Sequence, residues 1–156
     1  MSFIAGPFTI TLGGSAIGIV EDAPSLEITP SVDTIRGDDM GDSVRDGVYR
    51  GGNCFVDMVL QEYNAAAAAT ALWPYAAEGV MGDVGDLLTD HDAALVFTKI
   101  AGTSALPATT RTFTSAILAP NFPVRYLMGS RLRNVPIRFQ CLPYDDSGTT
   151  RWFKDV

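Results

Sequence analysis

The stretch that decides the fold lies at residues 33–62 and reads DTIRGDDMGDSVRDGVYRGGNCFVDMVLQE. Its first part, residues 33–52, mixes aspartates and arginines with glycines and has no regular apolar periodicity. A connection of roughly 20 residues without secondary structure is uncommon in a compact domain and usually serves a function. Residues 33–52 therefore predict a long loop that contacts another molecule.

A strand and a helix are predicted directly after this loop. Residues 54–62 alternate two sets of side chains that are both partly apolar, which is typical of a strand covered on both faces. The alanine-rich run that follows predicts one short helix over residues 64–77, with Asn64 as its N-cap. Pro74 favours an end or a kink near that point.

The rest of the chain is punctuated into short alternating segments. Gly13 and Gly14 predict a tight hairpin turn with positive φ. Seven or eight strands with one helix and no βαβ rhythm predict one domain over residues 1–156, an antiparallel β-sandwich or barrel with long loops. Outside the stretch quoted above, the expected strands are 8–12, 15–20, 26–29, 95–100, 111–118, 124–127 and 135–141.

Composition indicates a folded domain with separated charge. The chain has 156 residues, of which 47% are hydrophobic and 19% charged, and its net charge is −7. Residues 1–92 hold 15 acids and three arginines, a net of −12, whereas residues 93–156 hold eight bases and three acids, a net of +5. Two faces of opposite sign would favour head-to-tail association of copies, and a random surface distribution is the alternative.

Nothing in the sequence predicts a membrane span or a secretory signal. No apolar run approaches the ~20 residues that a membrane helix needs. The first residues lack a basic segment followed by an apolar one. We therefore expect synthesis in the cytoplasm. In that compartment Cys54 and Cys141, both inside apolar strand segments, are expected to be buried thiols rather than a disulfide or a zinc site.

The motifs of catalysis and of metal binding fail on spacing. Counted from Asp38 as an EF-hand, the sixth residue is Ser43 and the twelfth is Tyr49, where glycine and glutamate are needed. His91, between Asp90 and Asp92, is more simply part of a solvated loop than a metal ligand or an acid–base group. There is no nucleophile elbow and no nucleotide phosphate loop. We predict a protein that is not an enzyme and has no cofactor.

The order of features resembles the tail tube (major tail) proteins of long-tailed bacteriophages. A hairpin of short strands is followed by the Gly/Asp-rich loop from Arg36 to Gly52, then by the strand 54–62, a single helix and a terminal strand that ends FQCLPY at residues 139–144. The resemblance covers most of the chain as architecture. Many members carry Gly-x-Thr-Pro in the loop, where this chain has Gly41–Val44.

The resemblance implies a structural virion protein. Six copies would form a ring around a channel, and rings would stack head to tail into a tube that conducts genomic DNA without binding it specifically. The implied partners are further copies and other tail proteins, such as the tape measure, the terminator and the baseplate or tip. The implied location is the virion tail, after synthesis in the bacterial cytoplasm. The acidic composition suits passage of DNA, because phosphate contacts need Lys and Arg.

Two sets of site residues follow. Side chains of the loop are expected to contact neighbouring subunits, and polar side chains of two strands are expected to face the channel. The alternatives are another tail or connector protein, such as a tail terminator, or a β-sandwich module that binds calcium or carbohydrate. The expected contact residues are Asp38, Asp39, Asp42, Arg45, Asp46, Tyr49 and Arg50, and the expected channel residues are Asp57, Gln61, Arg138 and Gln140.

Overall fold

A computed structural model describes residues 8–17, 24–38, 41–60, 73, 81–99, 110–123 and 135–156. These residues are mainly strand, and the helical element described in full is a short 3-10 turn, η3 (Leu88–His91). All strand pairings among them are antiparallel. The predicted mainly β, antiparallel fold is confirmed. None of the described helical residues forms a helix that is long and apolar enough to span a membrane.

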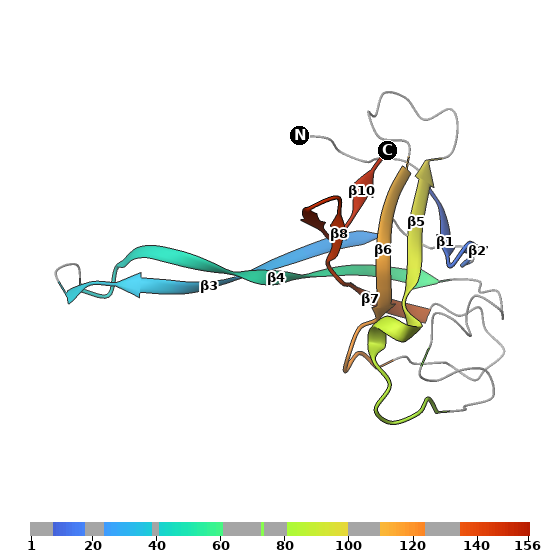
Figure 1. Cartoon of the computed structure of the whole chain (residues 1–156), viewed down its shortest axis with the longest axis horizontal. Helices are drawn as coiled ribbons and strands as arrows, with labels where there is room; N and C mark the ends of the chain where they lie inside the picture. Colours follow the sequence, from blue (N-terminus) through green and yellow to red (C-terminus); the bar gives the residue numbers. More distant parts are fainter. Residues whose placement is uncertain are drawn as a thin grey trace.

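The strands form one large sheet and one small hairpin. The large sheet has the order β2-β1-β5-β6-β7-β4-β3, and β10 adds to the edge of β6. In Figure 1, β5 and β6 stand upright while β3 and β4 cross them, so the sheet changes direction around its centre. The bounds are β1 (Phe8–Leu12), β2 (Ser15–Ala16), β3 (Ser25–Arg36), β4 (Val44–Leu60), β5 (Ala93–Lys99), β6 (Thr110–Leu118), β7 (Val135–Cys141), β8 (Tyr144–Asp146), β9 (Thr149–Arg151) and β10 (Lys154–Asp155).

Alternating apolar residues of β1, β4, β5, β6 and β7 build the core. Phe113 and Phe139 are the largest fully buried side chains. Phe97 meets Phe113 edge to face, with ring centroids 5.8 Å apart, a favoured aromatic geometry. Every second residue of β7 is buried and the residues between are not, which is the period-2 pattern expected for residues 135–141.

The C-terminal strand closes part of the sheet edge. β7 pairs with the last residues of β6, while β10 pairs with Arg111 and Thr112 near its start. The Arg111 guanidinium donates to both carboxylate oxygens of Asp155 at 2.6 and 2.7 Å, and it lies 4.3 Å from the centre of the Phe153 ring. This bidentate contact and the ring hold the end of the chain onto β6.

Several expected boundaries are confirmed. Gly13 and Gly14 form the turn between β1 and β2 with φ of 57° and 85°, as predicted. The strands expected at 8–12 and 135–141 have the predicted bounds, and those expected at 95–100 and 111–118 are shifted by one or two residues. The expected strand 124–127, the end of the strand 15–20 and the helix 64–77 lie outside the described residues, except Trp73, which is in a turn.

The prediction for residues 33–52 is corrected. They were expected to form an irregular loop, but β3 continues to Arg36 and β4 already begins at Val44. The strand predicted at 26–29 was expected to end at Pro30, but β3 continues through this proline. Proline is tolerated there because β3 is the edge strand of the sheet, so one side of it needs no hydrogen-bond donor.

We expect truncation of the central phenylalanine to destabilise the whole sheet. Phe139→Ala removes a side chain that is 1% exposed and leaves a cavity, which costs about 3–5 kcal/mol of unfolding free energy. Thr114→Ala, on an exposed position of β6, is the control and should change stability by less than about 0.5 kcal/mol. Urea unfolding measures both values, and equal effects would contradict this assignment of the core.

Candidate functional site: the hairpin arm

The most distinctive feature of the molecule is a hairpin that leaves the body of the sheet. Residues 54–57 of β4 lie between β7 and β3, and residues 58–60 pair with β7. Among the described residues, 44–53 pair with β3 alone. Figure 1 shows this part of the hairpin as a twisted two-stranded ribbon that projects far from the other strands. At about 3.3 Å per residue, its outer part is ~30 Å long. We name residues 29–53 the arm.

One face of the arm is an extension of the core. Residues directly opposite each other on antiparallel strands share a face, so Leu26 and Ile28 lie on the same face as the buried Val56 and Cys54. Along β3 that face continues with Pro30 and Val32. The apolar face of the hairpin is therefore formed by Leu26, Ile28, Pro30, Val32 and, opposite Val32, Tyr49.

This apolar face is exposed to solvent in the single chain. Leu26 is 37% exposed, and the value rises along the arm to 59% at Tyr49. In the body of the sheet the same face is almost completely buried. The sequence thus repeats the apolar pattern of a core strand where the described part of the chain offers nothing to cover it.

Two β-bulges shape the arm, and each inserts an arginine into β4. Register shifts leave Arg50 as the extra residue between Tyr49 and Gly51, and Arg45 as the extra residue nearer the tip. Gly51 has a φ of 108°, a conformation that favours glycine. The Arg50 Nε donates to Asp33 Oδ2 at 2.6 Å, so this ion pair joins the two strands of the arm.

Glycines on the apolar face keep the two strands close together. A Cβ at Gly52 would lie 2.8 Å from the carbonyl oxygen of Thr29, and a Cβ at Gly47 would lie 2.6 Å from Val32 Cγ1. Both glycines share the face of Tyr49. The glycines that suggested a loop in the sequence are therefore needed for the close packing of a ribbon.

A cluster around Arg138 fixes the root of the arm. Arg138 lies on β7, and its Nη2 donates to Glu27 Oε2 on β3 at 2.8 Å. Its guanidinium also lies 3.7 Å from the carboxylate of Asp57 and 4.2 Å from the centre of the Phe55 ring, both on β4. One side chain thereby connects three strands, including β3, with which β7 does not pair.

The residues predicted to contact other subunits all belong to the arm, where described. Asp38 and Asp42 lie near the tip, and Asp39 lies outside the described residues. Arg45, Asp46, Tyr49 and Arg50 lie on β4. The prediction missed the apolar face, although Leu26, Ile28 and Val32 alternate in the sequence and Pro30 shares their phase.

The residues predicted to face a channel share the other face of the sheet. Asp57 pairs with Arg138, and Gln140 pairs with Phe55, so all four lie on the face opposite to the buried Cys54 and Val56. Gln61 lies outside the described residues. The carboxylates and the guanidinium on this face are paired with one another, and the assignment of this face to a channel remains a prediction.

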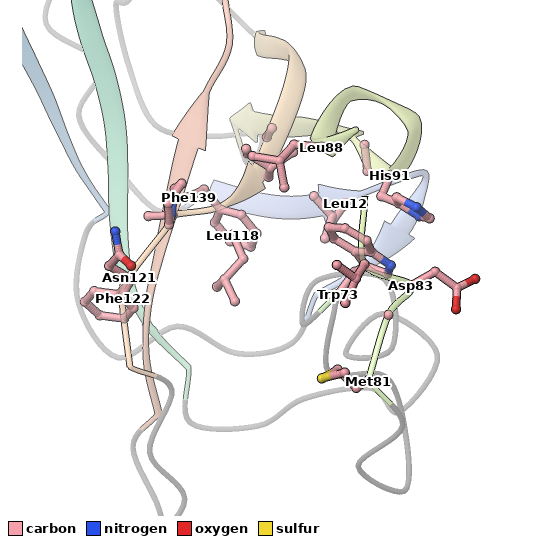
Figure 2. A pocket seen from close by; sticks show the side chains of 17 residues that line it. Leu12, Trp73, Met81, Asp83, Leu88, His91, Leu118, Asn121, Phe122 and Phe139 are labelled. Atoms are coloured by element: carbon pink, nitrogen blue, oxygen red, sulfur yellow. The ribbon is translucent and has the colours of Figure 1, made fainter. Parts of the chain in front are cut away.

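The single histidine takes part in a local contact. His91 Nε2 lies 2.9 Å from Asp86 Oδ2, and the imidazole stacks on Trp73 with centroids 3.9 Å apart (Figure 2). The neighbouring Asp92 accepts a hydrogen bond from Ser115 on β6. Within the described ranges, no three His, Cys, Asp or Glu side chains converge as a metal site would require.

The two cysteines are buried free thiols, as predicted, and they lie directly opposite each other on β4 and β7. Leu142 N donates to Ser115 O, and Ala119 N donates to Arg138 O, both at 2.8 Å. The main chain of even-numbered residues of this strand thus faces β6, so the main chain of Cys141 faces β4. The two cysteines therefore form the wider, hydrogen-bonded type of antiparallel pair. A hydrogen bond from the Cys141 thiol lowers the pKa of Cys54, while this bond and burial raise the pKa of Cys141.

We predict that Arg138→Met loosens the root of the arm. Loss of two ion pairs and of the ring contact should lower the unfolding free energy by about 1 kcal/mol and speed amide exchange in residues 25–29. Arg151→Met is the control, because Arg151 pairs with Asp146 in the β8–β9 hairpin. Hydrogen-exchange mass spectrometry checks both, and unchanged exchange in residues 25–29 would refute the role of Arg138.

The chain was also compared with known proteins. It matches no known protein-family model, and no curated protein sequence matches it. Its function is therefore inferred from the fold and from the arm.

Proposed function

We propose that the protein is a tail tube (major tail) protein of long-tailed bacteriophages. Its copies form rings around a channel, and the rings stack head to tail into a tube through which DNA passes. The arm carries this proposal: an apolar ribbon, continuous with the core, extends away from the body of the protein. A surface of this kind is suited to permanent contact with another protein chain.

The physical need for a partner supports the proposal. An isolated two-stranded hairpin is marginally stable in water, because it has no third layer to bury its apolar face. The arm spans β3 and β4 well beyond the last residue that β7 supports, which is Cys54. Exposed apolar patches on soluble proteins mark interaction sites. A neighbouring copy would bury the face and stabilise the ribbon.

The edge position of β3 also suits a ring of copies. Among the strands that the structure describes, β3 ends the sheet on one side and pairs along one long edge, with β4. A row of main-chain donors and acceptors is then available to another chain, and a closed ring is one way to satisfy such an edge. In the proposed tube, Asp57, Arg138 and Gln140 line the channel.

The charge of the chain is compatible with DNA passage. The net charge is −7, and the pI is about 4.5. An acidic wall repels phosphates and lets DNA move without adhering. On the face assigned to the channel, Arg138 is occupied by Glu27 and Asp57, so its charge is largely neutralised within the chain.

The test is removal of the arm without damage to its root. Thr29 and Asn53 lie directly opposite each other, so residues 30–52 can be replaced by the turn Asn-Gly, which closes a two-residue hairpin. We expect the full chain at high concentration to form rings or tubes in negative-stain electron microscopy. The shortened chain should stay monomeric, with its melting temperature within a few degrees of the unassembled full chain.

Two results would oppose the proposal. The first is a full chain that remains monomeric when concentrated, and the second is a shortened chain that assembles equally well. A melting curve in EDTA is run in parallel. A metal-dependent binding module would lose stability on chelation, whereas we expect the same melting temperature with and without EDTA.

A further inference from the structure

The exposed large apolar side chains of the described residues are concentrated in two places. Apart from Val156 at the end of the chain, all of them belong either to the β3–β4 hairpin or to the segment 81–88 before and within η3. We name the second group the rim. The hairpin group is Leu26, Ile28, Val32, Ile35, Val44, Val48 and Tyr49, and the rim is Met81, Val84, Leu87 and Leu88.

The rim borders a mainly apolar cavity. Met81, Val84 and Leu88 line a hollow of about 450 Å³, whose floor is built from β1, β6 and β7. Figure 2 shows Leu12, Leu88 and Leu118 around this hollow, with Phe122 and Phe139 on one side of it. A cavity of this volume is large enough to accept a small ligand or a few side chains.

The arm has a feature of matching shape. Val32 and Tyr49 stand opposite each other on the apolar face, about half exposed. On β4 the neighbouring positions of the same face are Gly47 and Gly52, which have no side chains. On β4 the pair is therefore flanked by two glycines, whereas on β3 its neighbours on this face are Pro30 and Thr34. We name Val32 and Tyr49 the knob. On the β4 side, no side chain at the neighbouring positions of this face obstructs the entry of Tyr49 into a cavity.

The positions of the knob and the cavity require two molecules. In Figure 1 the arm projects sideways from the sheet, while η3 and the segment before it lie below β5 and β6. Contact between them in the same chain would need the arm to fold back on its own root, which Arg138 holds. Contact between copies is heterologous, and repetition of it generates rings or filaments.

The arm as a whole is net acidic, with five aspartates and three arginines in residues 29–53, so any charge attraction at this contact is confined to single side chains. Asp83 lines the cavity, and two further aspartates follow nearby in the sequence, Asp86 and, in η3, Asp90. We call residues 83–90 the acidic segment. Arg36 lies on the apolar face beyond Val32, at the tip of the arm. The Arg36 Nη1 donates to the main-chain carbonyl of Asp42. This carbonyl is neutral, so the contact does not offset the positive charge of the guanidinium. A tip arginine would approach the acidic segment as the knob enters the cavity.

We infer that the cavity behind the rim is the seat for the arm of a second copy, with Val32 and Tyr49 inserted into it. The rim closes over the apolar face, and Arg36 lies against the acidic segment. This inference rests on the proposed assembly for its role in a tube, but the knob-and-seat contact can be tested independently of tube formation.

Disulfide trapping between two variants tests the seat. Val32→Cys and Leu88→Cys are made in separate chains, mixed, and oxidised with diamide, which is reduced as two thiols join. We expect a heterodimer on non-reducing gels in at least about ten-fold excess over the matched control. In that control Ser31→Cys, next to Val32 but on the opposite face of the arm, replaces Val32→Cys. Equal yields from the two pairs, or none from either, would overturn the inference.

A variant with a filled cavity provides the second readout. Gly82 lines the cavity, and Gly82→Trp should occupy it. We expect trapping of Val32→Cys with the doubly substituted Gly82→Trp, Leu88→Cys chain to fall by at least about five-fold, while circular dichroism shows that the chain is folded. Unchanged trapping would refute the seat. It would mean that the arm does not enter the cavity, even if the cavity binds small apolar molecules.

Microscopy separates failure of the seat from failure of the proposed function. If rings or tubes form but the Val32 and Leu88 variants do not trap selectively, the arm docks elsewhere and the tube proposal stands. If trapping is selective but concentrated protein shows neither rings nor tubes, the knob-and-seat contact holds and the tube proposal fails.

Discussion

The structure depends on how β4 is paired along its length. Its inner part, residues 54–60, pairs with β7 and is buried on one face, whereas among the described strands its outer part pairs with β3 alone. On β3 the apolar face continues past this transition, because Pro30 and Val32 follow Leu26 and Ile28 in the same phase. Burying apolar surface stabilises a protein by roughly 25 cal/mol per Å². The apolar face of the outer part is exposed and does not contribute this stabilisation in the single chain. A second molecule that covered this face would add it.

The described residues form a body with a buried core and an arm that is mostly exposed. The body has a continuous core of buried side chains, and the C-terminal strand covers the exposed start of β6. The arm has cross-strand hydrogen bonds and an ion pair between Arg50 and Asp33, and its described residues are mostly exposed. Arg138 lies at the boundary and links β7 to both strands of the hairpin. Assembly through the arm therefore need not disturb the core.

The sequence allowed the body to be predicted well and the arm poorly, for a physical reason. Strict alternation predicted β1 and β7 with their correct bounds, because nothing interrupts it there. In the arm, Arg45 and Arg50 each shift the phase of β4 by one residue. Simple alternation in the sequence therefore assigns residues of β4 beyond a bulge to the wrong face. Six residues predicted to contact other subunits lie on the arm, and their contact with a partner stays a prediction: Asp38, Asp42, Arg45, Asp46, Tyr49 and Arg50. The apolar face was not predicted, because the strand that begins near Leu26 was expected to end at Pro30.

The two bulges also determine the path that a partner must take. A bulge increases the right-handed twist of a strand pair, and a free two-stranded ribbon already twists more than a wide sheet. The apolar face of the arm consequently winds around the ribbon axis between Leu26 and the tip. A flat neighbour could touch only a short length of it. Continuous coverage requires a surface that winds with the same hand, so the twist of one hairpin would fix the handedness of any assembly built from it.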